Sequence, residues 1–377
     1  MNLTEDTNKY AYWLYRIPGL GSKTIETMLS YCNGDVINVY HTPKKAWKMV
    51  LEEKQYKLFL GAEGIETVEE EYQKMQEAGI RMVVRGEKGY PSRLEKIWDP
   101  PYVLFYVGIL PEEERLSVAL IGARDCSTYG SYVAESLGAY LGQNGVQVIS
   151  GMARGIDGIG QRAALDAGGT SFAVLGCGVD ICYPRQNKSI YDVLKERGGV
   201  LSSYLPGTMA KAQHFPPRNR IVSALSDAVV VVEAREKSGT LITVDMALEQ
   251  GKDVYVTPGR ITDRLSDGCN RLLEQGAGVV LSPKHFLEEL LKNHGDRRCG
   301  AGRQMGDESV RGKIQKKLSD DLAQVYDALD FSPQSVDAIM AKMPEAYGCA
   351  KLNASLMQLC LLDYVGQPCA GFYTRKI

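Results

Sequence analysis

Histidine is scarce in this sequence, and its cysteines follow no regular spacing. The 377 residues include 4 His and 9 Cys, and no Cys-x-x-Cys or His-paired motif occurs among them. Zinc sites and disulfide frameworks depend on such motifs. We therefore expect no metal site and no disulfide framework, and the simplest interpretation is a protein with reduced thiols.

Long apolar runs and an excess of positive charge are also absent. No apolar run approaches the roughly 20 residues of a membrane-spanning helix, and the N-terminus is polar, so we expect a cytoplasmic protein that does not enter a membrane. The formal net charge is -2. This value excludes a globally basic nucleic-acid-binding protein, so any contact with phosphates must come from a local cluster of Lys and Arg.

Composition divides the chain into four predicted parts. Residues 1–75 have helical patterns, and 76–292 alternate apolar runs with helical patterns. Residues 293–317 are rich in Gly and cations, which predicts a basic flexible linker. Residues 318–377 show three helical patterns and a hairpin, which predicts a winged-helix-like domain. Its expected recognition helix has Lys351 as its one cation, which favours contact with a protein over reading of DNA.

The second part predicts the fold class. Short Val- and Ile-rich runs, separated by helical patterns, are typical of βαβ units and of strands buried on both faces. The expected strands are 81–84, 117–121, 146–149, 171–175, 200–202, 228–233, 253–257 and 278–281. We therefore expect an α/β fold with a doubly wound, mostly parallel sheet, and functional residues in the loops at the carboxyl ends of its strands.

A Pro-Gly-x-Gly turn lies between two helical patterns of the N-terminal part, at residues 18–21. The exposed N–H groups of such a turn can hold a DNA phosphate. The same turn also serves as a plain connection in a small helical packing domain. Both interpretations of this SAM-like or helix-hairpin-helix-like domain remain open.

Two glycine loops each follow an expected strand and precede a helix. They are Gly122-Ala123-Arg124 and the segment 150–157, and each carries an arginine. Glycine lets a backbone approach an anion closely, and the free N–H groups of a helix start attract negative charge. Neither loop is a full Gly-x-Gly-x-x-Gly, and no acidic residue ends the next strand, so the motifs for dinucleotide binding are weak.

Further cations lie in segments 183–188, 211–220 and 237–240. Together they predict a ring of positive charge at the upper edge of the sheet, which attracts phosphates without regard to sequence. Tyr183 and Phe215 accompany these cations. Their rings either offer faces on which bases stack, or pack against the core as aromatic residues beside prolines usually do.

At this point the sequence resembles the DprA/Smf family of DNA-processing proteins. The shared motifs are Ser-Gly-x-Ala-Arg-Gly-Ile-Asp at 150–157, Tyr-Pro-x-x-Asn at 183–187, Phe-Pro-x-Arg-Asn-Arg-Ile at 215–221, Ser-Gly-Thr-Leu-Ile-Thr at 238–243, Pro-Gly at 258–259 and Ser-Asp-Gly-x-Asn at 266–270. The resemblance spans the α/β part, and the flanking domains are similar to those of the longer family members.

This resemblance implies an extended Rossmann-like domain that binds single-stranded DNA, forms a homodimer, and helps load the RecA recombinase during natural transformation and homologous recombination. It implies no enzyme activity, no catalytic residue and no cofactor. The implied nucleic-acid-binding residues are Arg124, Arg185, Asn187, Lys188, Arg218, Asn219, Arg220 and Lys237. The implied pocket backbone comprises Gly122, Ser150, Gly151, Gly155, Ser238 and Gly239.

The sequence departs from the family pattern at two positions. Gln161 replaces a usual His, and Ser203 replaces a frequent Glu. These replacements put in doubt any proton transfer or charge pairing at those positions. Single-strand binding by cations does not depend on them.

The main alternative is a nucleotide-binding or phosphoribohydrolase-like enzyme on a related Rossmann-like fold. Ser238-Gly239-Thr240 aligns with part of the motif of those enzymes, but Thr243 then stands where the catalytic carboxylate belongs. A hydroxyl cannot stabilise a developing oxocarbenium charge as a carboxylate does. A third alternative is an interaction module whose sheet loops hold a small anion.

Overall fold

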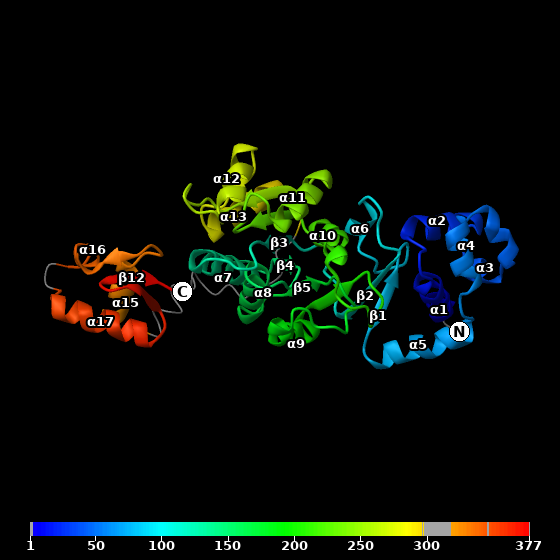
Figure 1. Cartoon of the computed structure of the whole chain (residues 1–377), viewed down its shortest axis with the longest axis horizontal. Coiled ribbons are helices and arrows are strands. Elements are labelled where there is room, and N and C mark those ends of the chain that lie inside the picture. The colour runs from blue at the N-terminus through cyan, green and yellow to red at the C-terminus, as the bar shows by residue number, and fades with distance from the viewer. Residues whose placement is uncertain (1–2, 296, 298–317, 345–346, 377) are drawn as a thin grey trace.

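A computed structural model describes residues 3–295, 297, 318–344 and 347–376 of the chain. The described parts follow one another along the long axis of the molecule: N-terminal helices at one end, a large sheet in the centre and a small C-terminal unit at the other end (Figure 1). Within these residues no helix has the length and apolarity needed to cross a membrane.

The N-terminal part is helical, as predicted. Its elements are α1 (Leu3–Arg16), α2 (Ser22–Tyr31), α3 (Val36–His41), the 3-10 helix η1 (Lys44–Met49), α4 (Glu53–Leu60) and α5 (Ile65–Glu77). The turn between α1 and α2 needs glycine, because Gly19 has a φ of 81°. Tyr12 and Tyr15 of α1 pack on Phe105 of the sheet, with ring centroids 6.2 and 5.9 Å apart. The helices therefore share a core with the sheet.

The central sheet has nine strands. They are β1 (Arg81–Val84), β2 (Val103–Gly108), β3 (Ser117–Ile121), β4 (Gln147–Ser150), β5 (Ser171–Val174), β6 (Gly199–Ser202), β7 (Ala228–Val231), β8 (Asp253–Val256) and β9 (Gly278–Val279). Their order is β1-β2-β6-β5-β4-β3-β7-β8-β9. Strands from β6 to β9 in this order pair in parallel, whereas β2 pairs antiparallel with both β1 and β6. The predicted doubly wound, mostly parallel α/β sheet is confirmed.

Strand β2 was not among the expected strands. It lies at the antiparallel edge, between β1 and β6, and no helical pattern of crossover length separates it from β1 or β3. The sequence criterion for the other strands was their alternation with helices, and an edge hairpin lacks that signal.

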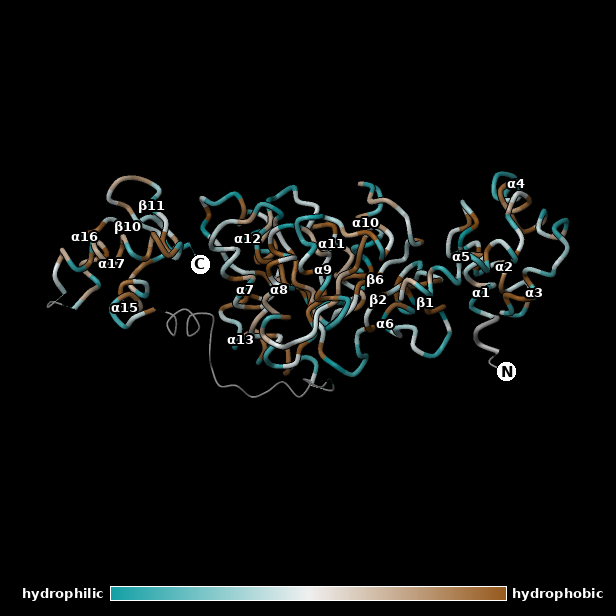
Figure 2. The backbone as a smooth tube through the Cα atoms, turned by 90° about the horizontal axis from the view of Figure 1, so that it is seen from below, coloured by the Kyte–Doolittle hydropathy of each residue, from teal (hydrophilic) through white to brown (hydrophobic). Residues whose placement is uncertain are grey.

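Helices cover both faces of the sheet (Figure 1). They are α6 (Ser92–Glu95), α7 (Thr128–Gln143), α8 (Ile156–Asp166), α9 (Lys188–Arg197), α10 (Phe215–Ala224), α11 (Gly239–Glu249), α12 (Asp267–Glu274) and α13 (Pro283–Asn293), with 3-10 turns η2 (Arg185–Asn187) and η3 (Ala212–His214). Neighbouring β3 residues serve opposite faces: Ile121 packs with residues of α10 and α11, and Leu120 with residues of α7 and α13. Hydrophobic segments accordingly run through the centre of the molecule (Figure 2).

Helix α10 corrects the expectation that the functional residues lie in loops. The segment with Arg218, Asn219 and Arg220 is helical, and Pro216 and Pro217 occupy its first turn. Proline is tolerated there because the first helical N–H groups have no partner within the helix. The prolines therefore mark the start of a helix instead of a loop.

The C-terminal unit has the predicted elements plus one short strand. It contains α15 (Asp320–Ala328), β10 (Gln334–Ser335), α16 (Val336–Met340), α17 (Cys349–Leu361), β11 (Val365–Cys369) and β12 (Phe372–Arg375), with the strands in the order β10-β12-β11. This matches the element order of the predicted winged helix. Lys351 is paired with Asp321 at 2.6 Å. Most of the predicted basic linker, 298–317, lies outside the described residues.

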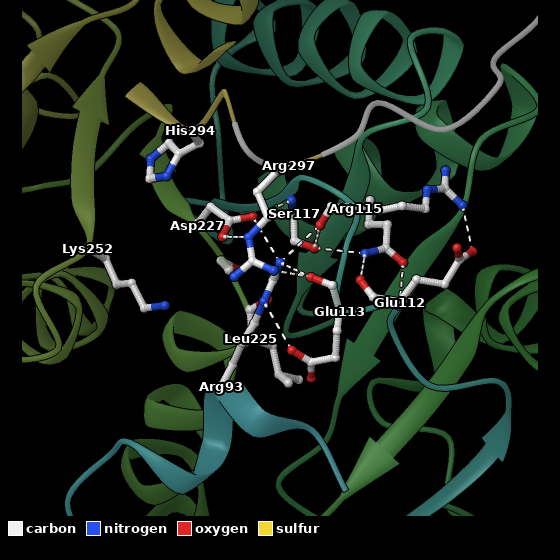
Figure 3. Close-up of polar contacts among 12 residues, drawn as sticks. Arg93, Glu112, Glu113, Arg115, Ser117, Leu225, Asp227, Lys252, His294 and Arg297 are labelled. Atoms are coloured by element: carbon white, nitrogen blue, oxygen red, sulfur yellow. Dashed lines mark hydrogen bonds and ion pairs between the residues drawn. The ribbon is translucent and has the colours of Figure 1, made fainter. Parts of the chain in front are cut away.

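A buried ionic network joins the amino ends of the central strands (Figure 3). Arg93 of α6 donates to an oxygen of Asp227 at 3.1 Å and to the carbonyl of Leu225 at 2.6 Å. The same Asp227 oxygen accepts the N–H of Ser117 at 2.9 Å. Arg297 also faces Asp227, at 3.5 Å. The network fixes the start of β3 to the start of β7.

Lys252, beside this network, should make stability depend on pH. Burial lowers the pKa of its ammonium from 10.5 to about 8. Between these values the unfolded chain holds a proton that the folded chain has lost, so the free energy of unfolding should rise from pH 8 toward pH 10. Urea unfolding should show this rise weakened in Lys252→Met and retained in Lys284→Met, which alters an exposed lysine. An unchanged rise in Lys252→Met would contradict the assignment.

Candidate nucleic-acid interface

A hollow lies at the carboxyl ends of the parallel strands, around the point between β3 and β7 where the strand order reverses. Two adjoining cavities of about 480 and 740 Å³ share six lining residues there. The shared residues are Arg124, Gly151, Ala153, Tyr183, Phe215 and Arg218. We call the two cavities together the cationic groove. Its position is the one expected for a ligand of a doubly wound sheet.

Cations outnumber acids along the cationic groove. The cations that line it are Arg124, Arg154, Arg185, Lys211, Arg218, Arg235 and Lys237. The acids are Asp125 and Asp157. Asp125 faces Arg154 at 3.5 Å, and Asp157 lies below the surface. A chain with a slightly negative total charge therefore gathers a positive field at this one edge.

Arg218 forms the base of the groove. Its side chain is 5% exposed, and its guanidinium donates to the carbonyls of Gly151, at 2.7 Å, and Val174. Burial lowers the pKa of the Arg218 guanidinium, and the nearby Asp157 carboxylate opposes that shift. A Cβ on Gly151 would lie 2.6 Å from the guanidinium, so a larger residue there would displace the Arg218 side chain. Arg218 thus shapes the floor and brings positive charge beneath it.

Arg124, Arg185 and Lys237 are exposed at the surface of the groove. None of the three has a carboxylate within 4.0 Å among the residues that the structure describes. They come from the loops after β3, β5 and β7, as the sequence predicted. Exposed cations of this kind release counterions when they meet phosphates, so they are suited to a polyanion.

Tyr183 and Phe215 stack on one another. Their ring centroids are 5.7 Å apart with an angle of 27° between the planes. The guanidinium carbons of Arg124 and Arg218 lie 5.6 and 5.7 Å from the Phe215 ring. Tyr183 remains 45% exposed, so its ring extends the aromatic stack to the surface of the groove. Base stacking on Tyr183 stays a prediction.

Two backbone N–H groups at this edge, one just after the first glycine loop and one in the second, are bound by the chain's own carboxylates, which corrects part of the expectation from the sequence. The Glu233 carboxylate accepts the N–H of Ser127, the N-cap residue of α7, at 2.9 Å. In the second loop Asp157 accepts the N–H of Gly151 at 3.1 Å. Carboxylates of the chain itself therefore already bind part of the backbone in the region where a Rossmann fold holds a dinucleotide phosphate. The cationic side chains supply the positive charge at this edge.

Loss of the Glu233 carboxylate should weaken the fold. Glu233 is buried, and Glu233→Leu leaves the Ser127 N–H without its acceptor. The expected loss in the free energy of unfolding is about 1–3 kcal/mol. Urea unfolding measures this loss, and Glu249→Leu, at an exposed position of α11, is the matched control. Equal stability of both variants would show that the carboxylate does not hold the helix start.

Two of the predicted site residues lie outside the groove lining. The Asn187 amide donates to the carbonyls of Met152 and Ala153 at 2.9 and 3.0 Å, which fixes the second glycine loop. Lys188 is exposed and pairs with Asp192 one helical turn away. Neither lines the groove, and their contact with nucleic acid stays a prediction.

Three other predicted site residues are also absent from the groove lining. Arg220 points to Asp99, with 2.6 Å between nitrogen and oxygen. The Ser150 hydroxyl donates to the carbonyl of Leu120 at 2.7 Å, within the sheet. Gly155 adopts a φ of 73° at the start of α8, where the backbone leaves no room for a Cβ. By contrast Gly122, Asn219, Ser238 and Gly239 line the groove as predicted.

Arg235 is a groove residue that the sequence analysis missed. It lies in the loop after β7, which ends at Val231, on the other side of the reversal point from Arg124. The available signal was a cation just after a buried strand, the same signal that identified Arg124. Arg154 was noted as the arginine of the second glycine loop and Lys211 as a cation of the ring, but neither was included in the predicted site.

The two departures from the family pattern lie outside the groove lining. Gln161 is buried, and its amide donates to Phe172 and Ser171 at 3.0 and 3.1 Å. The Ser203 carbonyl accepts the hydroxyl of Tyr15. Both residues therefore make structural contacts. The replacement of the family's usual His and Glu at these positions leaves the cations of the groove in place.

Metal ligands do not gather in the described residues: no group of three or more His, Cys, Asp or Glu could hold a metal ion there. The cysteines that the structure describes are all free. The groove therefore offers cations, aromatic rings and small backbone turns as its chemical groups.

Comparisons with known proteins find relatives of this chain. The model of the family described as DNA recombination-mediator protein A matches residues 81–291. The DNA processing protein DprA of Streptococcus pneumoniae is 43% identical over 200 residues, which are 53% of this chain and 71% of that protein. A crystal structure of DprA from the same species matches with a TM-score of 0.63 and 35% identity, over 74% of this chain and 97% of that one. A Helicobacter pylori DNA processing protein A, solved to study its single-stranded DNA binding mode, matches with a TM-score of 0.52 and 32% identity, over 57% of this chain and 96% of that one.

Proposed function

Because the chain belongs to the family of DNA recombination-mediator protein A, we propose that it binds single-stranded DNA in the cationic groove. The resemblance seen in the sequence is thereby confirmed at the level of the family. One observation carries the proposal. The groove is rich in exposed cations, while the N–H of Ser127 at the start of α7 and the N–H of Gly151 are already bound by the carboxylates of Glu233 and Asp157.

This combination favours a polyanion over a small phosphate compound. A mononucleotide or dinucleotide is held chiefly by helix-start N–H groups, whereas a nucleic-acid strand is held by separate cations along its backbone. The stacked rings of Tyr183 and Phe215, beside Arg124, add an aromatic surface to the cations of the groove. Stacking on such surfaces favours unpaired bases.

The test is a titration of labelled oligo-dT against a duplex of equal length. The proposal predicts tighter binding of the single strand and an affinity that falls steeply with salt, because counterions are released from each contacted phosphate. A shallow salt dependence, with displacement by free mononucleotides at equal concentration, would instead support a small-anion pocket.

We further infer that the groove is not a catalytic site. Thr243 lines it at the position that the phosphoribohydrolase alternative assigns to a carboxylate. A hydroxyl there cannot stabilise an oxocarbenium-like charge. The chain should therefore release no free base from nucleoside monophosphates under conditions in which it binds oligo-dT.

The wider role in the proposal rests on the family. We propose that the protein helps load the RecA recombinase onto bound strands during natural transformation and homologous recombination, acts in the cytoplasm and forms a homodimer. Exposed apolar residues such as Leu248 and Leu281 on the β8–β9 side of the sheet are consistent with self-association. Sedimentation should show dimers at micromolar concentration, and RecA filaments should nucleate faster on strands that carry the protein.

A further inference from the structure

Trp98 differs from the other two tryptophans of the chain. Its side chain is 81% exposed, whereas Trp13 is 3% and Trp47 is 0% exposed. A single exposed apolar residue needs no explanation by itself. The exposure of Trp98 does need an explanation, because the surrounding contacts hold this side chain in place.

The loop that carries Trp98 is fixed at several points. The next residue, Asp99, has a φ of 55°, and its carboxylate pairs with Arg220 at 2.6 Å. Pro100 and Pro101 follow, and the Pro101 carbonyl accepts the hydroxyl of buried Tyr90 at 2.6 Å. Proline restricts the backbone and the ion pair adds a second restraint. The exposed indole is therefore presented by an ordered loop, and little conformational entropy is lost when a ligand binds it.

A cation lies on one face of the indole. The ammonium of Lys23, in the first turn of α2, is 3.8 Å from the centroid of the Trp98 ring. Lys23 is exposed, and no carboxylate in the described part of the chain lies within ion-pair distance of it. An aromatic face with an available cation beside it is the combination that takes up a base and its phosphate.

Helix α10 connects this place to the cationic groove. Arg218 and Asn219 line the groove, and the next residue, Arg220, holds the Trp98 loop through Asp99. Helices α10, α6 and α2 follow one another along the same side of the molecule (Figure 1). A strand that leaves the groove along α10 thus reaches the junction with the N-terminal helices.

We propose that Trp98 and Lys23 form a second single-strand contact, in which a base stacks on the indole and the ammonium meets a phosphate. This contact rests on the proposed function, because it extends the path of a strand bound in the cationic groove. It gives the N-terminal helices a direct part in holding DNA, through a side chain of α2 instead of the turn before it.

Tryptophan fluorescence tests the contact directly. Trp13 and Trp47 are buried, so quenching by a stacked base must come from Trp98. Oligo-dT of about 30 nucleotides should quench the emission, and oligo-dT of about 6 nucleotides, which the proposal confines to the groove, should quench it far less. In Trp98→Phe, which keeps an aromatic ring, the quenching should disappear while binding remains.

Affinity gives a second readout. Trp98→Ala should weaken binding of the long strand by about five- to 150-fold, which corresponds to one stacked base, and leave the short strand unaffected. Met49→Ala, which alters a residue 94% exposed on η1, is the matched control and should change neither. Failure of both strands to bind the unaltered protein would overturn the proposed function. Tight binding of both strands with no quenching and no effect of Trp98→Ala would overturn this contact alone.

Discussion

Replacing Arg124 and Lys237 together by Glu will lower the affinity for single-stranded DNA by at least about 25-fold at about 0.1 M salt. Each phosphate contact adds about −0.7 to the slope of log K against log salt for single strands, so the loss of two contacts alone accounts for that factor. Charge reversal adds repulsion. Both side chains are exposed, so the fold should be unaffected. A fluorescence-anisotropy titration over a range of salt concentrations measures the affinity and the slope together.

The control for this experiment has the same change in net charge. Lys74→Glu with Lys284→Glu reverses two exposed lysines that do not line the groove. This control should bind nearly as tightly as the unaltered protein, with the same salt slope. Equal losses in both double variants would mean that total charge, and not the groove, determines binding.

Removal of Arg93 is expected to have the largest effect on stability. Its side chain and that of Asp227 are 5% and 6% exposed, and their ion pair at 3.1 Å is buried beneath the amino ends of the strands (Figure 3). Arg93→Ala leaves the Asp227 carboxylate in a buried site with Arg297 as its remaining cationic neighbour in the network. Breaking a buried pair on one side lowers the free energy of unfolding by about 3–5 kcal/mol.

Urea unfolding should separate this pair from a surface pair. Arg271 and Glu236 lie 2.6 Å apart with more than half of each side chain exposed, and Arg271→Ala should lower stability by less than about 1 kcal/mol. In the double variant Arg93→Met with Asp227→Asn, much of the loss from Arg93→Ala should be recovered, because no charge is left buried. A loss from Arg93→Ala no larger than that from Arg271→Ala would show that the network does not stabilise the sheet.

The sheet could be predicted from the sequence because its parallel strands are buried on both faces and read as continuous apolar runs. β3 and β8 lie within one residue of their predicted bounds. Strand β2 was missed because its signal depends on neighbours far away in the sequence, whereas α10 was missed because its prolines were interpreted as loop residues. Strand β2 forms through its pairing with β1 and β6. Helix α10 begins with a turn that contains two prolines, just before Arg218.

The candidate site could be predicted in its composition but only partly in its geometry. Strand-end position placed Arg124 and Lys237 correctly at the groove, since the carboxyl ends of parallel strands meet at one edge. The same criterion did not reveal that Arg220 holds Asp99, or that Glu233 occupies the start of α7. Such tertiary pairings leave no periodic trace in one sequence.

Crosslinking tests most directly whether a single strand lies in the cationic groove. An oligo-dT that carries photoreactive thymine is bound, irradiated and digested with the protein, and the crosslinked peptides are identified by mass spectrometry. Crosslinks at Tyr183 and Phe215, lost after charge reversal of Arg124 and Lys237, are the predicted result. Crosslinks confined to α17 or to the edge beside Arg93 would contradict it.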